Sequence, residues 1–290
     1  MRIAVCMKQV PALSDGGMDE KTGTLIRSGQ KAVPNIYDLS ALEAALRSRE
    51  SAEDENFAID VYTMGPKSAE ALIREAYAYG ADHGYLICDS KFAGADVLAT
   101  SYTLARAIRE NGPYDLVFCG KQTTDGDTSQ VSAALAKWLE LPSFSGVTDV
   151  RIIQENGKDR IYLKQRLDDR VLTLKAGLPS LIAVEKETFP ARMPSLKLRL
   201  RAGKKEITRI EAGSFRPESG GIKEKEYFGQ KGSATRVIRI FPPERAEKHP
   251  VAELDGKEAG KQILDIWEGL GLRKERNHDF EERARDSGLS

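Results

Sequence analysis

The sequence predicts an α/β protein with a doubly wound, mostly parallel sheet, and three observations lead to this class. Apolar runs of strand length alternate with amphipathic helical patterns through the first half of the chain, an alternation typical of βαβ units. Gly, Pro and Asp stand where such helices end or begin. After Pro142 the pattern changes to short strands separated by turn residues, which predicts antiparallel hairpins at the edge of the sheet.

The first half gives a regular order of elements. They are a strand over 3–10, a helix over 39–49, a strand over 57–64, a helix over 68–79, a strand over 85–88 and a helix from Asp96 through Ile108. Asp38 and Asp96 stand at the N-cap positions of their helices, and Gly80 is placed to end the second helix. Residues 11–34 form a polar connection, and we expect a connection of this length to have a function.

The stretch from 115 to 141 carries the strongest local signal. Residues 116–119 are typical of a buried strand, and apolar residues from Val131 to Leu139 repeat on one helix face. The loop between them is rich in Gly, Thr, Ser and Asp. Backbone N–H groups at such a helix start bind phosphate. An ordinary solvent loop, with Asp127 or Thr128 as N-cap, fits the same spacing.

The second half is predicted to begin with short strands and to end in an arm. The strands cover 147–153, 160–163, 171–174 and 181–184. Beyond Phe189 come two prolines, a basic run over 197–205 and a stretch rich in Gly, Lys and Glu, which together have little to bury. We therefore expect an arm that lies on another surface. A short amphipathic helix is predicted over 258–272.

Composition excludes several classes of function. Lys+Arg and Asp+Glu both number 44, so no basic field favours nucleic acid as a partner. The three cysteines form no CxxC pair and the three histidines are scattered, so neither a metal site nor a catalytic triad is predicted. No apolar run reaches the roughly 18 residues that span a bilayer. We expect no membrane insertion and a soluble, cytoplasmic protein.

The carboxyl ends of the predicted parallel strands form the expected ligand-binding edge. Three strand ends meet there, namely 6–9, 64–66 and 120–131, and the helix start at 35–38 is a fourth candidate. Each segment alone is ordinary structure. The prediction of a site depends on the sheet bringing them together.

Several motifs, in order, resemble the beta subunit of electron transfer flavoproteins, from Ile3 to about Ile207. They are AVCMKQVP (4–11), NIYDLSALEAAL (35–46), TMGP (63–66), AYGAD (78–82), GKQTTDGDTSQV (120–131), LDDRVLTLKAGLPSLIAV (167–184) and PARMPSLKLRLRAGKKEI (190–207). The chain departs from the family pattern at Leu39 and at Ser132, where the family often has glycine. The resemblance implies an adenine-nucleotide alpha hydrolase-like fold and a larger alpha-subunit partner.

The resemblance also implies the cofactor. One branch of the family holds a structural AMP, and the branch that bifurcates electrons holds a second FAD. That FAD takes hydride from NADH and sends one electron to the alpha-subunit FAD and one to ferredoxin or flavodoxin, as in anaerobic metabolism. The loop DGDTSQV and the stretch TGTLIR (22–27) resemble the FAD-holding branch. A protein whose cofactor does the chemistry needs no catalytic side chains.

Carried over residue by residue, the resemblance implies the following site. The cofactor-binding residues are Cys6, Asn35, Ile36, Tyr37, Asp38, Met64, Gly120, Lys121, Gln122, Thr123, Thr124, Asp125, Gly126, Asp127, Thr128, Ser129, Gln130 and Val131. The amides of 129–131 and the Thr128 hydroxyl are expected at a pyrophosphate, and Cys6 and Met64 at an aromatic ring. Asp125 and Asp127 repel phosphate, so we expect one to cap the helix and the other to bind sugar hydroxyls.

The resemblance implies docking as well. Leu196 is expected to anchor the protein in an apolar pocket of a flavin-dependent dehydrogenase, either acyl-CoA dehydrogenase-like or acting on a hydroxy acid, with Arg199 and Arg201 at the rim. The predicted organisation is a nucleotide-binding domain over 1–189, a docking loop and extended arm over 190–235, and a C-terminal arm over 236–290. Two functions stay open, an electron-transfer subunit with a redox-active FAD and a scaffold with AMP. A third function, that of a generic adenylating α/β hydrolase domain, is not supported, because the sequence contains no catalytic or metal-binding motif for it.

Overall fold

The computed structural model describes residues 1–12, 32–51, 57–216, 227–236 and 255–270. Most of the predicted connection over 11–34 lies outside these residues, and so does the stretch 22–27. The chain divides into two units, Met1–Ile240 and Phe241–Ser290. No helix in the described ranges has the length and apolar character that a membrane crossing requires.

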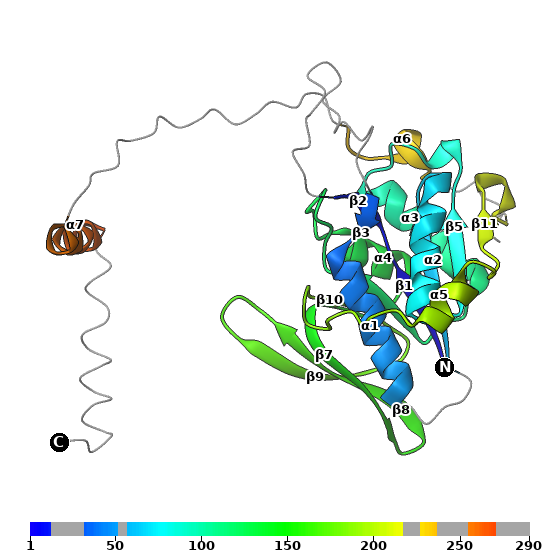
Figure 1. Ribbon diagram of the computed structural model, residues 1–290, viewed down its shortest axis with the longest axis horizontal. Helices are drawn as coiled ribbons and strands as arrows, with labels where there is room; N and C mark the ends of the chain where they lie inside the picture. Colours follow the sequence, from blue (N-terminus) through cyan, green and yellow to red (C-terminus); the bar gives the residue numbers. More distant parts are fainter. Residues whose placement is uncertain (13–31, 52–56, 217–226, 237–254, 271–290) are drawn as a thin grey trace. The chain divides into compact units, whose positions relative to one another are not determined.

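A nine-stranded sheet organises the first unit (Figure 1). Its order is β11 (Thr208–Ile210), β5 (His83–Ile87), β4 (Ala58–Met64), β1 (Arg2–Cys6), β6 (Leu116–Gly120), β10 (Ser180–Val184), β7 (Ser143–Glu155), β8 (Lys158–Arg166) and β9 (Val171–Gly177). Pairing is parallel from β11 to β7 and antiparallel from β7 to β9. The predicted fold class, with its antiparallel edge, is confirmed. A small antiparallel pair, β2 (Gln9–Pro11) and β3 (Ala32–Pro34), stands apart from this sheet.

The sheet changes direction between β1 and β6. From β1 the chain moves outward to β4 and then β5, and afterwards it returns to the other side of β1 to form β6. Where strand order reverses in this way, helices before and after the reversal lie on opposite faces and leave a crevice at the carboxyl ends of the strands. The strand order therefore makes the carboxyl ends of β1 and β6 the expected position for a ligand.

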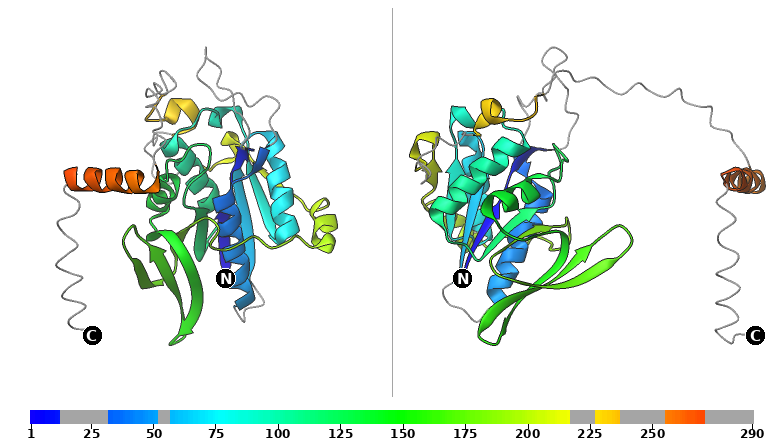
Figure 2. Two further views of the ribbon diagram at one scale, coloured as in Figure 1. Left: turned by 60° about the vertical axis from the view of Figure 1, so that its left-hand side comes forward. Right: turned by 180° about the vertical axis from the view of Figure 1, so that it is seen from behind.

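Helices cover both faces of the sheet (Figures 1 and 2). One face packs against α1 (Ile36–Ser51) and α2 (Glu70–Tyr79), and the other against α3 (Val97–Asn111) and α4 (Val131–Leu139). Alternation along β1 shows the two cores, because Ile3 and Val5 belong to the first and Ala4 and Cys6 to the second. Such double-sided burial is the reason that parallel strands have continuous apolar sequences.

Two of the predicted helix ends are confirmed and one is wrong. The Asp96 carboxylate caps α3 by accepting the N–H of Ala99 at 3.0 Å, and Gly80 ends α2 at a positive φ of 123°. Asp38 is not an N-cap, because α1 begins two residues earlier, at Ile36. The Asp38 side chain binds backbone groups of other segments instead.

Between residues 196 and 236, the described part of the predicted arm contains regular structure and packs on its own domain. The basic run contains a helix, α5 (Leu196–Ala202), and β11 adds a strand to the sheet. Phe215, Tyr227 and Phe228 pack against the core beside α3, so these residues bury their aromatic rings on their own domain. Two short helices, η3 (Ala212–Ser214) and α6 (Gly229–Gly232), lie in the same stretch.

The second unit is described only at one helix. The predicted amphipathic helix is confirmed as α7 (Gly256–Gly269), and the Asp255 carboxylate caps it by accepting the N–H groups of Lys257 and Glu258. Its apolar side chains, including Ile263, Ile266 and Trp267, are exposed within the described residues.

Candidate functional site

Asp38 connects the two strand ends at the crevice. Its carboxylate accepts the N–H of Lys8, just beyond β1, at 2.8 Å and the N–H of Gly120, the last residue of β6, at 3.2 Å. Burial raises the pKa of Asp38 to about 7, although these N–H groups oppose the rise. A single side chain from the first turn of α1 thus fixes where β1 and β6 end.

Gly120 allows this approach because it has no side chain. A Cβ at this position would lie 2.3 Å from Asp38 Oδ1 and 2.6 Å from Tyr37 Cβ. Both distances are shorter than any ordinary contact, so α1 can start here only against a glycine. The predicted site residues Tyr37, Asp38 and Gly120 are therefore in direct contact.

Asn35 connects the loop over 121–130 to the same place. Its side-chain amide is fully buried, donates to the carbonyl of Gln122 at 2.9 Å and accepts the N–H of Thr124 at 3.4 Å. The Asn35 backbone N–H donates to the carbonyl of Lys8 at 3.0 Å. The structure thus brings the predicted segments 35–38 and 120–131 together at the end of β1.

Both carboxylates of the loop are engaged within the chain. Lys8 Nζ donates to the two oxygens of Asp125 at 2.7 and 2.8 Å. Burial alone would raise the pKa of Asp125, but the hydrogen bonds and the charge of Lys8 outweigh burial and lower it. Asp127 accepts a hydrogen bond from the side chain of Gln122. Lys8, which lies in the predicted strand end 6–9 but is not one of the predicted cofactor-binding residues, offsets the negative charge of the loop.

Helix α4 begins without a side-chain cap. Its N-cap residue is Gln130, and among the described residues this position provides no side-chain acceptor for the first N–H groups. The prediction that Asp125 or Asp127 caps this helix is therefore wrong, because the helix begins at Val131 and both carboxylates bind other groups, Lys8 and Gln122. Within the part of the chain that the structure describes, the first N–H groups of α4 therefore have no side-chain cap, and N–H groups at a helix start can bind an anion.

The loop backbone before α4 has an unusual conformation. Asp127 and Ser129 have positive φ angles, 48° and 55°, although neither is glycine. Non-glycine residues in the left-handed region cost roughly 1–3 kcal/mol each and concentrate at functional sites. Alternation of left-handed with other residues turns successive N–H groups toward one point and forms an anion-binding nest. The Ser129 hydroxyl donates to Gln122 Oε1 at 2.8 Å and helps to hold this shape.

The remaining predicted site residues lie around these groups. Cys6 is buried in the core beside α3 and α4, and Met64 is half-buried against the same core at the end of β4. Lys121 Nζ forms an ion pair with Glu185 at 2.9 Å, while Ile36 is exposed. Thr123 accepts the N–H of Asp127 at its carbonyl, at 3.0 Å, and hydrogen-bonds the Asp125 side chain, and Val131 packs against the core beside α3. Gly126 and Thr128 have no such contact among the described residues. Thr63, next to Met64, has the buried hydroxyl that lacks a partner among the described residues.

The predicted docking residues lie at a different place, on α5. Leu196 and Leu200, one helical turn apart, are 73% and 68% exposed, and Arg199 is exposed beside them. Arg192 Nε donates to the buried carboxylate of Glu43 at 2.8 Å and fixes the preceding segment to α1. The segment before α5 is therefore attached to α1, while Leu196 and Leu200 on α5 are exposed.

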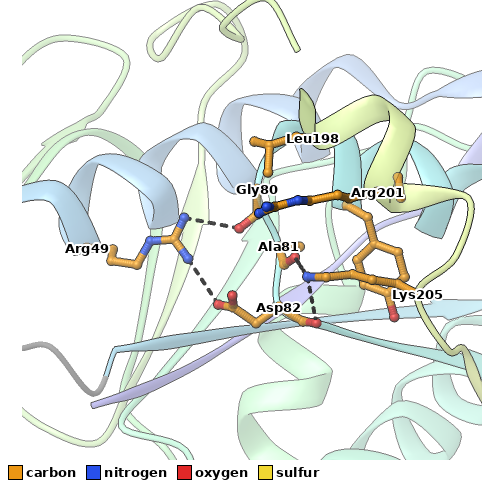
Figure 3. Close-up of a pocket in the computed structure, with 9 residues that line it drawn as sticks. Arg49, Gly80, Ala81, Asp82, Leu198, Arg201 and Lys205 are labelled. Carbon is orange, nitrogen blue, oxygen red and sulfur yellow. Dashed lines mark hydrogen bonds and ion pairs between the residues drawn. The ribbon is translucent and has the colours of Figure 1, made fainter. Parts of the chain in front are cut away.

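A cavity of about 300 Å³ separates α5 from the end of α2 (Figure 3). Arg201 points into this cavity, together with Arg49 and Lys205. Arg49 donates to the carbonyl of Gly80 at 3.0 Å, and Lys205 donates to that of Ala81 at 2.8 Å. Cations at these carbonyls cap the end of α2. Arg201 lines the cavity but is itself exposed, so its place at a docking rim stays a prediction.

A doubly wound sheet with an open helix start at its reversal point is the class of fold that binds nucleotides at this edge. The electron transfer flavoprotein domain model matches residues 22–214. The chain belongs to the electron transfer flavoprotein family, and its relatives place it with the beta subunits.

Three relatives illustrate the similarity. Protein FixA of Bradyrhizobium diazoefficiens is 40% identical over 91% of this chain and 90% of its own length. The electron transfer flavoprotein subunit beta of Thermoanaerobacterium thermosaccharolyticum is 37% identical over 91% of this chain and 97% of its own. The subunit beta of Megasphaera elsdenii is 34% identical over 85% and 89%. The family predicted from the sequence motifs is confirmed.

Proposed function

We propose that this beta subunit binds FAD at the ends of β1 and β6 and belongs to an electron-bifurcating flavoprotein. In this role the FAD accepts hydride from NADH, and the electrons pass to the alpha-subunit FAD and to ferredoxin or flavodoxin. The observation that carries the proposal is the start of α4, which has no side-chain cap among the described residues and follows the left-handed residues Asp127 and Ser129. These N–H groups suit a pyrophosphate, which carries several acceptor oxygens and negative charge.

The charges around the loop fit such a ligand. Asp125 forms an ion pair with Lys8, so its negative charge is neutralised and repels a bound phosphate less. The Thr128 hydroxyl and the amides of 129–131 are the proposed phosphate donors. Asp127 is the proposed partner of sugar hydroxyls, since its single described hydrogen bond leaves acceptor capacity. Cys6 and Met64 provide apolar surface for a ring.

Gly126 supports an external ligand as well. Its φ is not left-handed, and an added Cβ would meet only the Thr123 hydroxyl, at 3.4 Å. Neither the backbone conformation nor the packing of the described chain requires a glycine here. Close approach of a bound phosphate is a physical reason for the missing side chain.

The nucleotide content of the purified complex with the alpha subunit tests this function. We expect two FAD per heterodimer, measured from the visible spectrum and from nucleotide release, and reduction by NADH without any dehydrogenase present. One FAD with one AMP would instead support the scaffold function and overturn bifurcation. Reduction by NADH of a preparation that holds only the alpha-subunit flavin would contradict the proposed route of hydride.

A glycine substitution tests the site itself. Gly126→Val is expected to lower nucleotide content at the beta site and to leave the alpha-subunit flavin in place. The matched control is Gly213→Val, because a Cβ at Gly213 meets nothing within 4 Å and lies outside the proposed site. Both variants should unfold at the same urea concentration as the wild type, which shows that they are folded. Full nucleotide occupancy of the beta site in Gly126→Val would then count against the assignment of this loop to the site.

We also propose that α5 docks a flavin-dependent dehydrogenase. The exposed pair Leu196 and Leu200 offers an apolar contact, and the exposed cations Arg199 and Arg201 lie on the same helix. An apolar centre within a charged rim is the ordinary composition of a protein interface. An acidic rim on the partner would complement it and accelerate encounter.

A further inference from the structure

Cys6 and Cys119 occupy opposite positions on neighbouring strands. β1 and β6 are parallel, Val5 pairs with Phe118, and the next residue on each strand is a cysteine. Both side chains lie in the core that also contains Ala4 and Val117, so they leave the sheet on the same face. Neighbouring strands are about 4.8 Å apart, which lies within the Cα separation that a disulfide spans.

The two thiols interact in the reduced state. The pKa of Cys119 is raised well above its usual value, first by the hydrogen bond with the Cys6 thiol and then by burial. Cys6 is 9% exposed and Cys119 is 5% exposed. Cys6 is therefore the more exposed of the two residues and the one that a small oxidant reaches more easily. The Cys119 thiol is its hydrogen-bonded neighbour.

Cys88 lies too far from Cys6 and Cys119 to pair with either of them. It follows β5, which is separated from β6 by β4 and β1. It packs against the core on the opposite face. A bridge from Cys88 to either of the other cysteines would need the sheet to unfold, so Cys88 is a natural control.

We propose that Cys6 and Cys119 form a reversible intrachain disulfide when the protein meets a peroxide-class oxidant. The Cys6 thiolate attacks a peroxide oxygen, which breaks the O–O bond and gives a sulfenic acid and, for hydrogen peroxide, hydroxide. The Cys119 thiol then attacks the oxidised sulfur, and water leaves. The two thiols lose two electrons and two protons, and one hydrogen peroxide becomes two water molecules. A thiol reductant reverses the reaction.

The disulfide is coupled to the crevice through Asp38. Cys6 stands two residues before Lys8, and Cys119 directly precedes Gly120, and both of these N–H groups bind the Asp38 carboxylate. Formation of a sulfur–sulfur bond of about 2.05 Å brings two hydrogen-bonded sulfur atoms closer, and the strand ends that carry them adjust, which shifts this contact. Because Asp38 is at the start of α1 and Gly120 at the start of the loop, the proposed nucleotide site is distorted. This coupling rests on the proposed function, whereas the disulfide does not.

Peptide mapping tests the disulfide. The reduced protein is treated with hydrogen peroxide, alkylated and digested with trypsin. We expect peptide 3–8 linked to peptide 110–121 with the loss of two hydrogens, and recovery of both alkylated peptides after treatment with dithiothreitol. Cys88→Ser should give the same linked peptide and Cys119→Ser none. Separate alkylation of Cys6 and Cys119 after peroxide treatment, or a link that involves Cys88, would overturn the proposal.

Nucleotide release tests the coupling separately. We expect oxidised wild-type complex to lose beta-site nucleotide several-fold faster than reduced complex, and Cys119→Ser to show no dependence on peroxide. A disulfide that forms without faster release would overturn the coupling alone. A beta site that holds no nucleotide before oxidation would refute the proposed function and leave the peptide result unchanged.

Discussion

Among single residues, Asp38 gives the clearest dependence on pH. Burial raises its pKa from 3.8 to about 7, so the folded protein holds a proton that the unfolded chain releases between these values. The free energy of unfolding therefore decreases as pH rises through this window, with a contribution of roughly 1.4 kcal/mol per pH unit from this group. The pKa of Asp125 is lowered, so its contribution to the free energy of unfolding is present at neutral pH. That contribution is lost only when the pH falls into the acidic range.

Asp38→Asn isolates this contribution. The amide cannot accept both N–H groups, so we expect a loss of about 1–3 kcal/mol together with a flatter pH dependence. Urea unfolding of nucleotide-free protein at pH 5, 6 and 7 measures both effects. If the wild type and Asp38→Asn gave parallel curves over this range, Asp38 would not carry the proton.

Gly120 and Gly126 are close in sequence but differ in what surrounds them. A Cβ at Gly120 meets Asp38 and Tyr37 at less than 3 Å, whereas one at Gly126 meets only Thr123 Oγ1, at 3.4 Å. We expect Gly120→Ala to lower the free energy of unfolding by about 1–3 kcal/mol. Gly126→Ala should leave it unchanged or raise it by up to about 1 kcal/mol. Urea unfolding of nucleotide-free protein tests the pair, and equal midpoints would contradict the contact at Gly120.

The segments that meet at the ends of β1 and β6 could be predicted from the sequence, but the hydrogen bonds between them could not. Motifs identified 35–38 and 120–131, because a loop and a helix start have local signatures. The Asp38 carboxylate binds an N–H group 82 residues away, and Lys8 pairs with Asp125 over 117 residues. No local pattern encodes such pairings. They arise because the order of strands places β1 beside β6.

At the scale of elements, Asp96 joins a helix to a distant segment. Its carboxylate caps α3 and also accepts the N–H groups of Ala234 and Thr235, each at 2.8 Å. Burial opposes ionisation, but these hydrogen bonds outweigh it and lower the pKa of Asp96. We expect Asp96→Ala to destabilise the first unit by at least the ~1 kcal/mol of a lost N-cap and to speed proteolysis near residue 235.

Asp255→Ala provides the control for this prediction. Asp255 also caps a helix through backbone N–H groups, but α7 belongs to the second unit. We expect the urea midpoint of the first unit to be unchanged in this variant. A midpoint lowered equally in both variants would show that the effect of Asp96 is not specific to α3 and its bound segment.

Most strands and helices were predictable because burial on both faces gives a continuous apolar pattern. β11 and α5 were not. β11 has only three residues, two of them polar and exposed, and its position is fixed by pairing with β5. α5 has a composition typical of a solvated loop, and its helix is held from outside, where Arg74 donates to the carbonyl of Ala202 at 2.8 Å. Tertiary contacts determined both elements.

At the scale of the whole first unit, the proposed nucleotide site lies at the carboxyl ends of the strands, and the proposed docking surface lies near their amino ends. Asp38 and Gly120 lie at the carboxyl ends of strands, whereas α5 packs beside Gly80 and Asp82, which precede the start of β5. A change on α5 should therefore alter docking without altering nucleotide content.

Leu196→Ala tests this separation. Full burial of a leucine side chain is worth roughly 1.5–3 kcal/mol, and Leu196 is 73% exposed, so most of that contribution is available to a partner. We expect electron delivery to the dehydrogenase to slow several-fold or more, while both nucleotides, heterodimer formation and reduction by NADH stay as in the wild type. Charge reversal at Arg199 should act mainly at low salt, because ions screen an exposed charge.

Ile153→Ala is the matched control, since Ile153 is an exposed aliphatic residue on β7, at the far side of the sheet. Its truncation should leave electron delivery unchanged. Leu200→Ala should act in the same direction as Leu196→Ala, because the two side chains are one helical turn apart on α5. Wild-type rates in both leucine variants, at a dehydrogenase concentration below saturation, would exclude α5 as the docking surface and leave the nucleotide site unaffected.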